Sequence, residues 1–120
     1  MPDLPLEVNV VPHENASFRV LRLNGPLTLS NLFDFQSIVR AADTRSTIVD
    51  LTGVPYVDSA GIGCLVGAYL SHQRNNRKFI LVGINDRIRN ILKITQVENV
   101  FSIHNSIEDA ISDATHAASA

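Results

Sequence analysis

The residues best suited to chemistry in this chain are Asp58, Ser59, Ala60 and Gly61, a short run between two apolar segments. The segment before them, 47–51, has the β-branched composition of a buried strand, and the segment after them has helical periodicity. Ser59 is therefore expected where a helix begins. The first N–H groups of a helix lack internal partners and carry partial positive charge, so this position suits a phosphate group. The same hydroxyl is equally suited to capping the helix, a contribution of about 1 kcal/mol.

A phosphate on Ser59 would stand beside the carboxylate of Asp58 and change the local charge from about −1 to about −3. A partner surface fitted to a neutral hydroxyl would then be repelled without any unfolding. Gly61 and Gly63 lie in the first turns of the expected helix, where glycine costs about 1 kcal/mol relative to alanine. Two explanations stay open for them: close approach of another surface, or tight packing of the turn against the sheet.

Other chemistry finds little support. A hydrolase nucleophile at Ser59 would need glycine two residues earlier, where Val57 stands, and no histidine is placed by a motif. The four histidines and single cysteine show no metal-ligand spacing, and no phosphate-binding glycine loop is present. We therefore expect no enzyme activity, no cofactor and no metal, and an enzyme or nucleotide binder is the least favoured class.

Composition bounds the remaining choices. A chain of 120 residues with 45% hydrophobic residues predicts one globular domain, and a formal charge of −2 gives no electrostatic case for nucleic-acid binding. No apolar run approaches the roughly 18 residues of a membrane span, so no membrane insertion is expected. The lone Cys64 fits a reducing cytoplasm, and we expect a cytoplasmic protein that is a monomer or weak dimer. A basic cluster at 74–78 is most simply a solvated face, and it could also steer an acidic partner.

Alternating strands and helices are expected around residues 58–61 (the central run) and must position them. The patterns predict strands at 6–11, 18–23, 47–51, 78–82 and 100–104, and helices at 31–42, 60–73, 86–95 and 107–114. Ser30, Asn85 and Ser106 are the expected caps of the other helices. The first two strands would form a hairpin, and the rest a largely parallel sheet with crossover helices.

With these flanks, the central run resembles the signature of STAS domains, which include the anti-sigma-factor antagonists of bacteria. The resemblance extends through IVDLTGVPYV and IGCLVGAYL around Asp58–Gly61, GPLT at 25–28, FILVGIND at 79–86, ILKITQVENVF at 91–101 and SIEDAI at 106–111. It implies one α/β domain at 6–113, with a loose N-terminus at 1–5 and a frayed tail at 114–120. The implied fold is a mixed sheet of four to five strands with about four helices packed mainly on one side.

The resemblance also implies a mechanism. In the antagonists, the serine directly after the motif aspartate is phosphorylated by a partner that is both an anti-sigma factor and a serine kinase. The unphosphorylated antagonist binds this partner and frees the sigma factor; the phosphorylated form is released, and a phosphatase resets it. Ser59 occupies that serine position, and Asp58 and Gly61 match the motif acid and glycine. The implied partner-binding residues are Asp58, Ser59, Ala60, Gly61 and Gly63, in a phosphoserine switch that regulates transcription.

Two departures keep an alternative open. Ala60 stands where many members have serine or threonine, and Pro26-Leu27-Thr28 stands where many antagonists carry an acidic residue. The Gly-Pro-Leu turn is similar to STAS domains attached to anion transporters. The alternative is a constitutive docking subunit of a transport or scaffold (stressosome-like) assembly, with Ser59 serving only as a helix N-cap.

Overall fold

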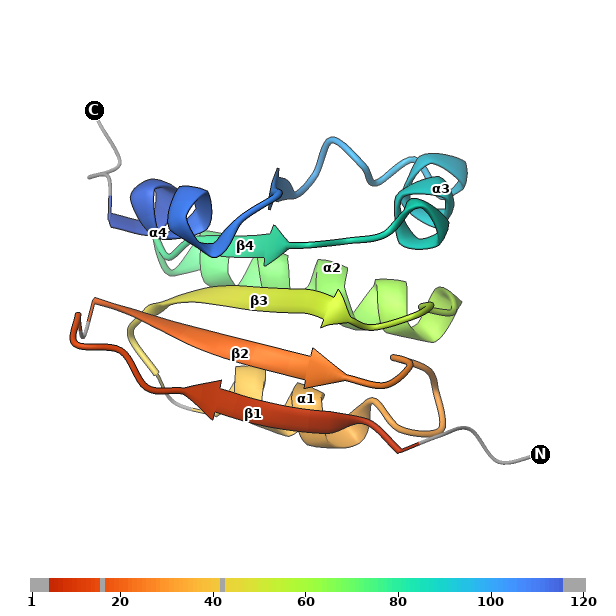
Figure 1. Cartoon of the computed structure of the whole chain (residues 1–120), viewed down its shortest axis with the longest axis horizontal. Coiled ribbons are helices and arrows are strands. Elements are labelled where there is room, and N and C mark those ends of the chain that lie inside the picture. Colours follow the sequence, from red (N-terminus) through yellow and green to blue (C-terminus); the bar gives the residue numbers. More distant parts are fainter. Residues whose placement is uncertain (1–4, 16, 42, 116–120) are drawn as a thin grey trace.

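The computed structural model describes residues 5–15, 17–41 and 43–115. Strands and helices follow one another in the predicted order (Figure 1): β1 (Glu7–Val11), β2 (Phe18–Asn24), α1 (Phe33–Arg40), β3 (Ser46–Gly53), α2 (Ser59–Arg74), β4 (Phe79–Val82), α3 (Asp86–Ile94), β5 (Ser102–His104) and α4 (Ile107–Thr115). The loose ends predicted at 1–5 and 114–120 fall almost wholly outside the described residues. Residue 5 is described and lies outside any helix or strand, and residues 114–115 belong to α4, which extends two residues past the expected boundary at 113.

The strands form one five-stranded sheet in the order β1-β2-β3-β4-β5. The predicted hairpin is confirmed, since β1 and β2 pair antiparallel, and the other neighbouring strands pair in parallel. The loops that leave β2, β3 and β4 therefore emerge at the same edge of the sheet, because parallel strands share the edge of their carboxyl ends. This edge brings together the starts of α1, α2 and α3.

The helices form two unequal layers. The larger core joins the sheet to α1, α2 and α3 through buried residues that include Phe35, Leu65, Ile88 and Leu92. A smaller core on the opposite face joins the sheet to α4, whose Ala110 packs with Phe18, Val20, Ile48, Ile80 and Val82. The two cores place α1, α2 and α3 on one face and α4 on the other, which confirms the mixed sheet with helices mainly on one side (Figure 1). None of the described helices is long and apolar enough to span a membrane.

Of the three caps predicted for α1, α3 and α4, the cap of α1 is wrong. The first helix begins at Phe33 rather than at Asn31, and its capping residue Leu32 contributes no side-chain hydrogen bond. Ser30 instead lies in a local turn, in which the Asn31 Oδ1 accepts from the Thr28 N–H at 2.8 Å. Short polar side chains often bond their own backbone in this way, and here that competes with helix initiation.

The other two predicted caps are confirmed. The Asn85 Oδ1 accepts from the Ile88 N–H at 2.9 Å at the start of α3. The Ser106 Oγ accepts from the Asp109 N–H at 3.1 Å at the start of α4. Each side chain satisfies one backbone donor that has no acceptor within its helix.

Candidate functional site

The cap of α2 is Asp58, not Ser59. Asp58 has extended backbone angles (φ −91°, ψ −177°), and its Oδ1 accepts from the Gly61 N–H at 2.8 Å. The expectation that Ser59 caps the helix is therefore wrong: Ser59 is the first helical residue. Aspartate is as strong a capping residue as serine, and a cap at residue 58 meets the N–H three residues later. The Ile62 N–H bonds to the Asp58 carbonyl oxygen at 2.9 Å.

The second carboxylate oxygen of Asp58 reaches a distant part of the chain. Its Oδ2 accepts from the Leu29 N–H at 3.1 Å. The Asp58 N–H in turn donates to the Leu27 carbonyl oxygen at 3.3 Å, and Leu27 pairs with Val57 in an isolated parallel bridge. Asp58 thus connects the start of α2 to the loop between β2 and α1, because each of its carboxylate oxygens accepts a hydrogen bond from a backbone N–H.

Because Asp58 carries the capping role, the Ser59 hydroxyl has none. Ser59 is exposed, and its hydroxyl makes no hydrogen bond to any described residue. The N–H groups of Ser59 and Ala60 come too early in the helix to have intrahelical acceptors. No other backbone acceptor for them occurs among the described residues. The site therefore offers an accessible hydroxyl beside two free donors at the positive end of a 16-residue helix.

The two glycines near Ser59 have different roles. Gly61 is buried, and a Cβ there would clash with the Leu27 carbonyl oxygen and with Cγ1 of Val57. Gly63 is exposed, and a Cβ there would meet nothing within 4 Å. Tight packing explains why residue 61 is a glycine. At Gly63 the space in front of the helix is open, so another surface can approach there. Of the predicted binding residues, Ser59 and Gly63 are therefore accessible, while Ala60 is half-buried and Gly61 acts through packing.

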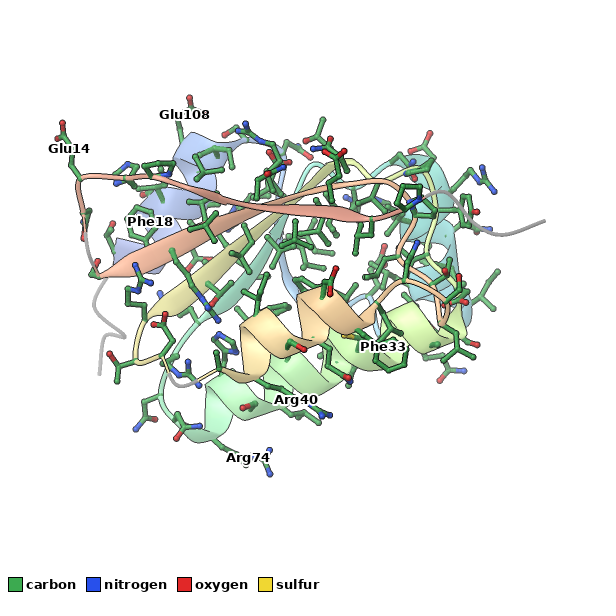
Figure 2. All side chains as sticks on the ribbon, turned by 90° about the horizontal axis from the view of Figure 1, so that it is seen from below. Glu14, Phe18, Phe33, Arg40, Arg74 and Glu108 are labelled. Carbon is green, nitrogen blue, oxygen red and sulfur yellow. The ribbon has the colours of Figure 1, made fainter. Side chains whose placement is uncertain are left out.

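Two apolar side chains extend this surface and were not part of the predicted site. Leu29 is 64% exposed and Phe33 is 60% exposed. Leu29 is the residue whose backbone Asp58 holds, and Phe33 begins α1 beside α2 (Figure 2). A signal for Phe33 was present in the sequence, because it falls off the apolar stripe of its helix. Leu29 has no such signal, since its position depends on a contact with a residue 29 positions away.

The start of α3 braces the loop between β3 and α2 from the other side. The Asn85 side-chain amide donates to the Pro55 carbonyl oxygen at 3.0 Å while its oxygen caps α3. The guanidinium of Arg87 lies 5.2 Å from the ring centroid of Tyr56, within cation–π range. The loop that presents Ser59 is thus held by both neighbouring segments.

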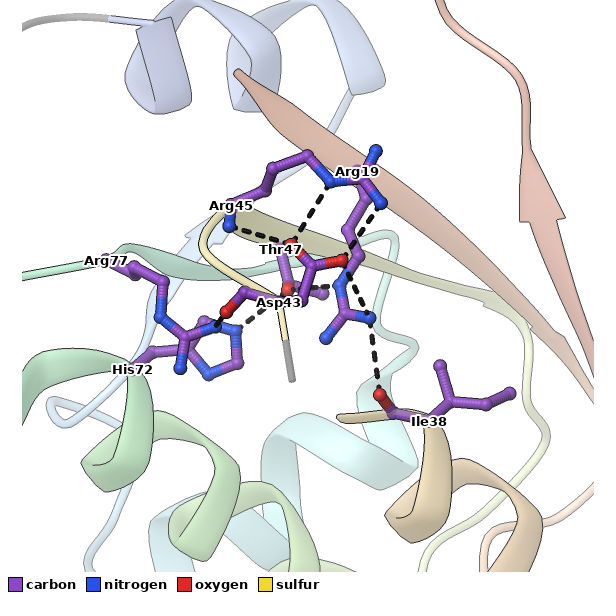
Figure 3. Close-up of polar contacts among 7 residues, drawn as sticks. All are labelled: Arg19, Ile38, Asp43, Arg45, Thr47, His72 and Arg77. Carbon is purple, nitrogen blue, oxygen red and sulfur yellow. Dashed lines mark hydrogen bonds and ion pairs between the residues drawn. The ribbon is translucent and has the colours of Figure 1, made fainter. Parts of the chain in front are cut away.

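The opposite end of α2 contains a buried polar chain that the sequence did not reveal (Figure 3). The His72 Nδ1 lies 2.7 Å from the Ala68 carbonyl oxygen, which can only accept, so Nδ1 carries the proton. The Thr47 hydroxyl then donates to His72 Nε2 at 2.8 Å and accepts from Arg19 Nε at 2.9 Å. Burial lowers the pKa of His72 and keeps the ring neutral. Every donor here has a structural partner except Arg19 Nη2, which is buried without a partner among the described residues.

Asp43 completes this cluster. Its carboxylate accepts from Arg45 at 2.9 Å and lies 3.6 Å from Arg19, while its carbonyl oxygen accepts from Arg77 at 2.6 Å. The hydrogen bond from Arg45 lowers the pKa of Asp43 to about 2. No group of metal-ligating side chains occurs in the described part of the chain. The hydrogen bonds and ion pairs of this cluster are therefore made within the protein, whereas the Ser59 hydroxyl is exposed.

Comparison with known proteins agrees with this geometry. Residues 8–110 match the STAS domain family, and the chain belongs to that family. The "Anti-sigma-B factor antagonist" of Staphylococcus aureus (strain NCTC 8325 / PS 47) is 26% identical over 106 residues, which cover 86% of this chain and 98% of the relative.

Two solved structures share the fold. An anti-sigma factor antagonist from Mycobacterium paratuberculosis has a TM-score of 0.79 at 19% identity, covering 91% of this chain and 93% of the other. The anti-sigma factor antagonist SpoIIAA in its unphosphorylated form has a TM-score of 0.74 at 18% identity, covering 94% and 100%. Both are similar to this chain in the arrangement of the whole domain.

Proposed function

We propose that this chain is an anti-sigma-factor antagonist that regulates transcription as a cytoplasmic partner switch. The unphosphorylated form binds an anti-sigma factor that is also a serine kinase, and phosphorylation of Ser59 releases it. A phosphatase restores the binding form. The observation that carries the proposal is the exposed Ser59 hydroxyl, which is free of a capping role because Asp58 caps α2. The relative named as an anti-sigma-B factor antagonist supports the same class of partner.

The physical basis of the switch is a change of charge on an otherwise unchanged surface. A phosphate on the first residue of α2 can accept from the free N–H groups of Ser59 and Ala60, so the helix tolerates it. Beside it lies the Asp58 carboxylate, and the exposed side chains of Leu29, whose N–H Asp58 holds, and of Phe33, at the start of α1, extend the surface. A partner that buries these apolar groups would also have to bury about two added negative charges, and that desolvation opposes binding.

The proposal is tested by intact-mass spectrometry after incubation with ATP and a kinase-containing lysate of the protein's own host. We expect one added phosphate on the wild type and none on Ser59→Ala. Ser37→Ala is the matched control, because Ser37 is an exposed serine on α1 and its variant should still accept the phosphate. If the wild type captures a partner but stays unmodified, the phosphoserine switch fails. The constitutive docking subunit would then take its place, with Asp58 rather than Ser59 as the cap.

A further inference from the structure

A groove runs between α1 and α2 on the outer surface of the helix layer. It consists of two adjoining hollows of about 280 and 380 Å³, which share Val39, Arg40 and Ser71 in their linings. The first hollow extends toward the start of α2, past Gly67 to Gly63. The second extends toward the end of α2, where Arg77 lies.

The charge of this groove is opposite to that of the chain as a whole. Arg40, Arg74 and Arg77 line it, and Figure 2 shows Arg40 on α1 and Arg74 on α2 along the same edge of the molecule. Asp43 is the only acidic residue in the two linings, and its carboxylate already pairs with Arg19 and Arg45. The groove therefore has a net positive formal charge, whereas the chain carries a formal charge of −2.

Stabilisation of the helices accounts for only part of this concentration of charge. A basic residue in the last turn offsets the negative end of a helix dipole, and Arg40 and Arg74 hold that position in α1 and α2. Arg77 lies beyond both helices, where it donates to the Asp43 carbonyl oxygen and also lines the second hollow. Neither Arg40 nor Arg74 has a hydrogen bond or ion pair to any described residue, so their guanidinium groups are available to a ligand.

The floor of the groove fits a polypeptide better than a single small anion. A Cβ added at Gly63 or at Gly67 would meet nothing within 4 Å, so another backbone can approach α2 closely. Helical rise places Gly63 and Asn75 about 18 Å apart, a distance that five or six extended residues span. The end near Gly63 is small and uncharged, and the arginines lie toward the other end.

We propose that the groove between α1 and α2 binds an acidic peptide segment of a partner protein. The carboxylates of the segment pair with Arg40, Arg74 and Arg77, and its small uncharged residues cover Gly63 and Gly67. Arginine forks suit this role, because they bind carboxylates with two parallel hydrogen bonds. The arginines lie toward the end of α2, away from Ser59 at its start, so pairing with them does not depend on phosphorylation.

Fluorescence anisotropy of the full chain with a fluorescein-labelled Leu-Ala-Gly-Glu-Glu-Glu-Glu peptide tests the proposal. We expect saturable binding that weakens with added salt, and a loss of about tenfold or more in affinity for Arg40→Glu and for Arg74→Glu. Lys93→Glu is the matched control, because it makes the same charge change at an exposed site on α3 and should leave affinity within about twofold. Gly67→Leu should block the groove and weaken binding without changing any charge.

Three outcomes would overturn the proposal. The first is that the wild type fails to bind the peptide. The second is that Arg40→Glu, Arg74→Glu and Lys93→Glu weaken binding equally. The third is that inorganic phosphate at matched ionic strength displaces the peptide from the wild type. The last result would mean that a small anion is the ligand. Ser59→Glu should bind the peptide as the wild type does, so failure here is separate from failure of the phosphoserine switch. Circular dichroism of each variant shows that it is folded.

Discussion

The two ends of α2 use polar side chains in opposite ways. At its start, the Asp58 carboxylate bonds two backbone N–H groups, and the neighbouring Ser59 hydroxyl is left exposed and without a bond to any described residue. At its end, Arg19, Thr47 and His72 bond one another inside the protein. One end therefore presents an accessible hydroxyl at the surface, and the other forms a buried network of hydrogen bonds.

The contrast shows why polarity alone does not identify a functional site. The cluster around His72 contains a histidine, a hydroxyl and a carboxylate, the residue types of a catalytic centre. Both ring nitrogens of His72 are hydrogen-bonded within the protein, and the residue has no exposed surface. No substrate can therefore reach the ring. The Ser59 hydroxyl has no activating partner among the described residues, but it is accessible. Its position at the start of a helix favours an added anion.

The largest expected effect lies at the buried end. Replacing Arg19 by alanine breaks the pair with Asp43 and leaves the Thr47 hydroxyl without its donor, so we expect a loss of about 3–5 kcal/mol in the free energy of unfolding. Arg89→Ala removes a more exposed pair with Glu98, at 3.5 Å, and should cost less than about 1 kcal/mol. Urea denaturation measures both. Equal losses would mean that the buried cluster contributes no more than a surface ion pair.

The next effect distinguishes the two glycines of α2. Gly61→Ala should lower stability by about 1–3 kcal/mol, because the added Cβ overlaps the Leu27 carbonyl oxygen and Val57. Gly63→Ala should raise stability by about 0.5–1 kcal/mol, because its Cβ enters open space and alanine favours the helix. Thermal unfolding of both variants checks the opposite signs. The same sign for both would contradict the different roles assigned to them.

A comparable effect is expected from the cap itself. Asp58→Ala removes both hydrogen bonds, to Gly61 and to Leu29, and should cost about 1–2 kcal/mol. Asp58→Asn is the matched control, since its one carbonyl oxygen keeps the cap and its amide cannot accept from Leu29. We expect the asparagine variant to retain most of the stability and lose order in the loop at 25–31, measured by hydrogen exchange of the Leu29 amide. Unchanged exchange at Leu29 would show that Asp58 does not hold this loop.

A further effect is a pH dependence of the buried end. His72 faces the Ala68 carbonyl oxygen, Arg19, Arg77 and Asp43, and burial lowers its pKa below the ordinary value of 6.5. The unfolded chain therefore binds a proton first as the pH falls below 6.5, and stability decreases by at most about 1.4 kcal/mol per pH unit. Asp43, with a pKa of about 2 against 3.8, loses its contribution only at much lower pH.

Denaturation curves between pH 7 and pH 5 measure this dependence. His72→Gln is the control, because it keeps a polar side chain and removes the titrating group, so the slope attributed to His72 should disappear. A slope that persists in His72→Gln would have to come from another group.

The sequence predicted most of the frame and part of the site. Apolar periodicity identified each strand and helix, and the residue types at the helix starts identified Asn85 and Ser106 as caps. Both kinds of feature depend on neighbours within a few residues. It assigned the cap of α2 to Ser59, since serine and aspartate cap equally well and only backbone angles distinguish residues 58 and 59. It did not find the contacts of Leu29 with Asp58 or of Arg19 with Thr47, which join segments 29 and 28 positions apart.

The most direct test of the account is the affinity of an anti-sigma factor partner for the unphosphorylated and the Ser59-phosphorylated protein, measured by isothermal titration calorimetry. Thermal unfolding of the two forms is recorded alongside. We predict that phosphorylation weakens binding by about a hundredfold or more while the unfolding temperature changes little, because the start of α2 can accommodate the phosphate. Equal affinity of the two forms would contradict the switch. Weaker binding accompanied by a large fall in the unfolding temperature would contradict the claim that charge alone operates it.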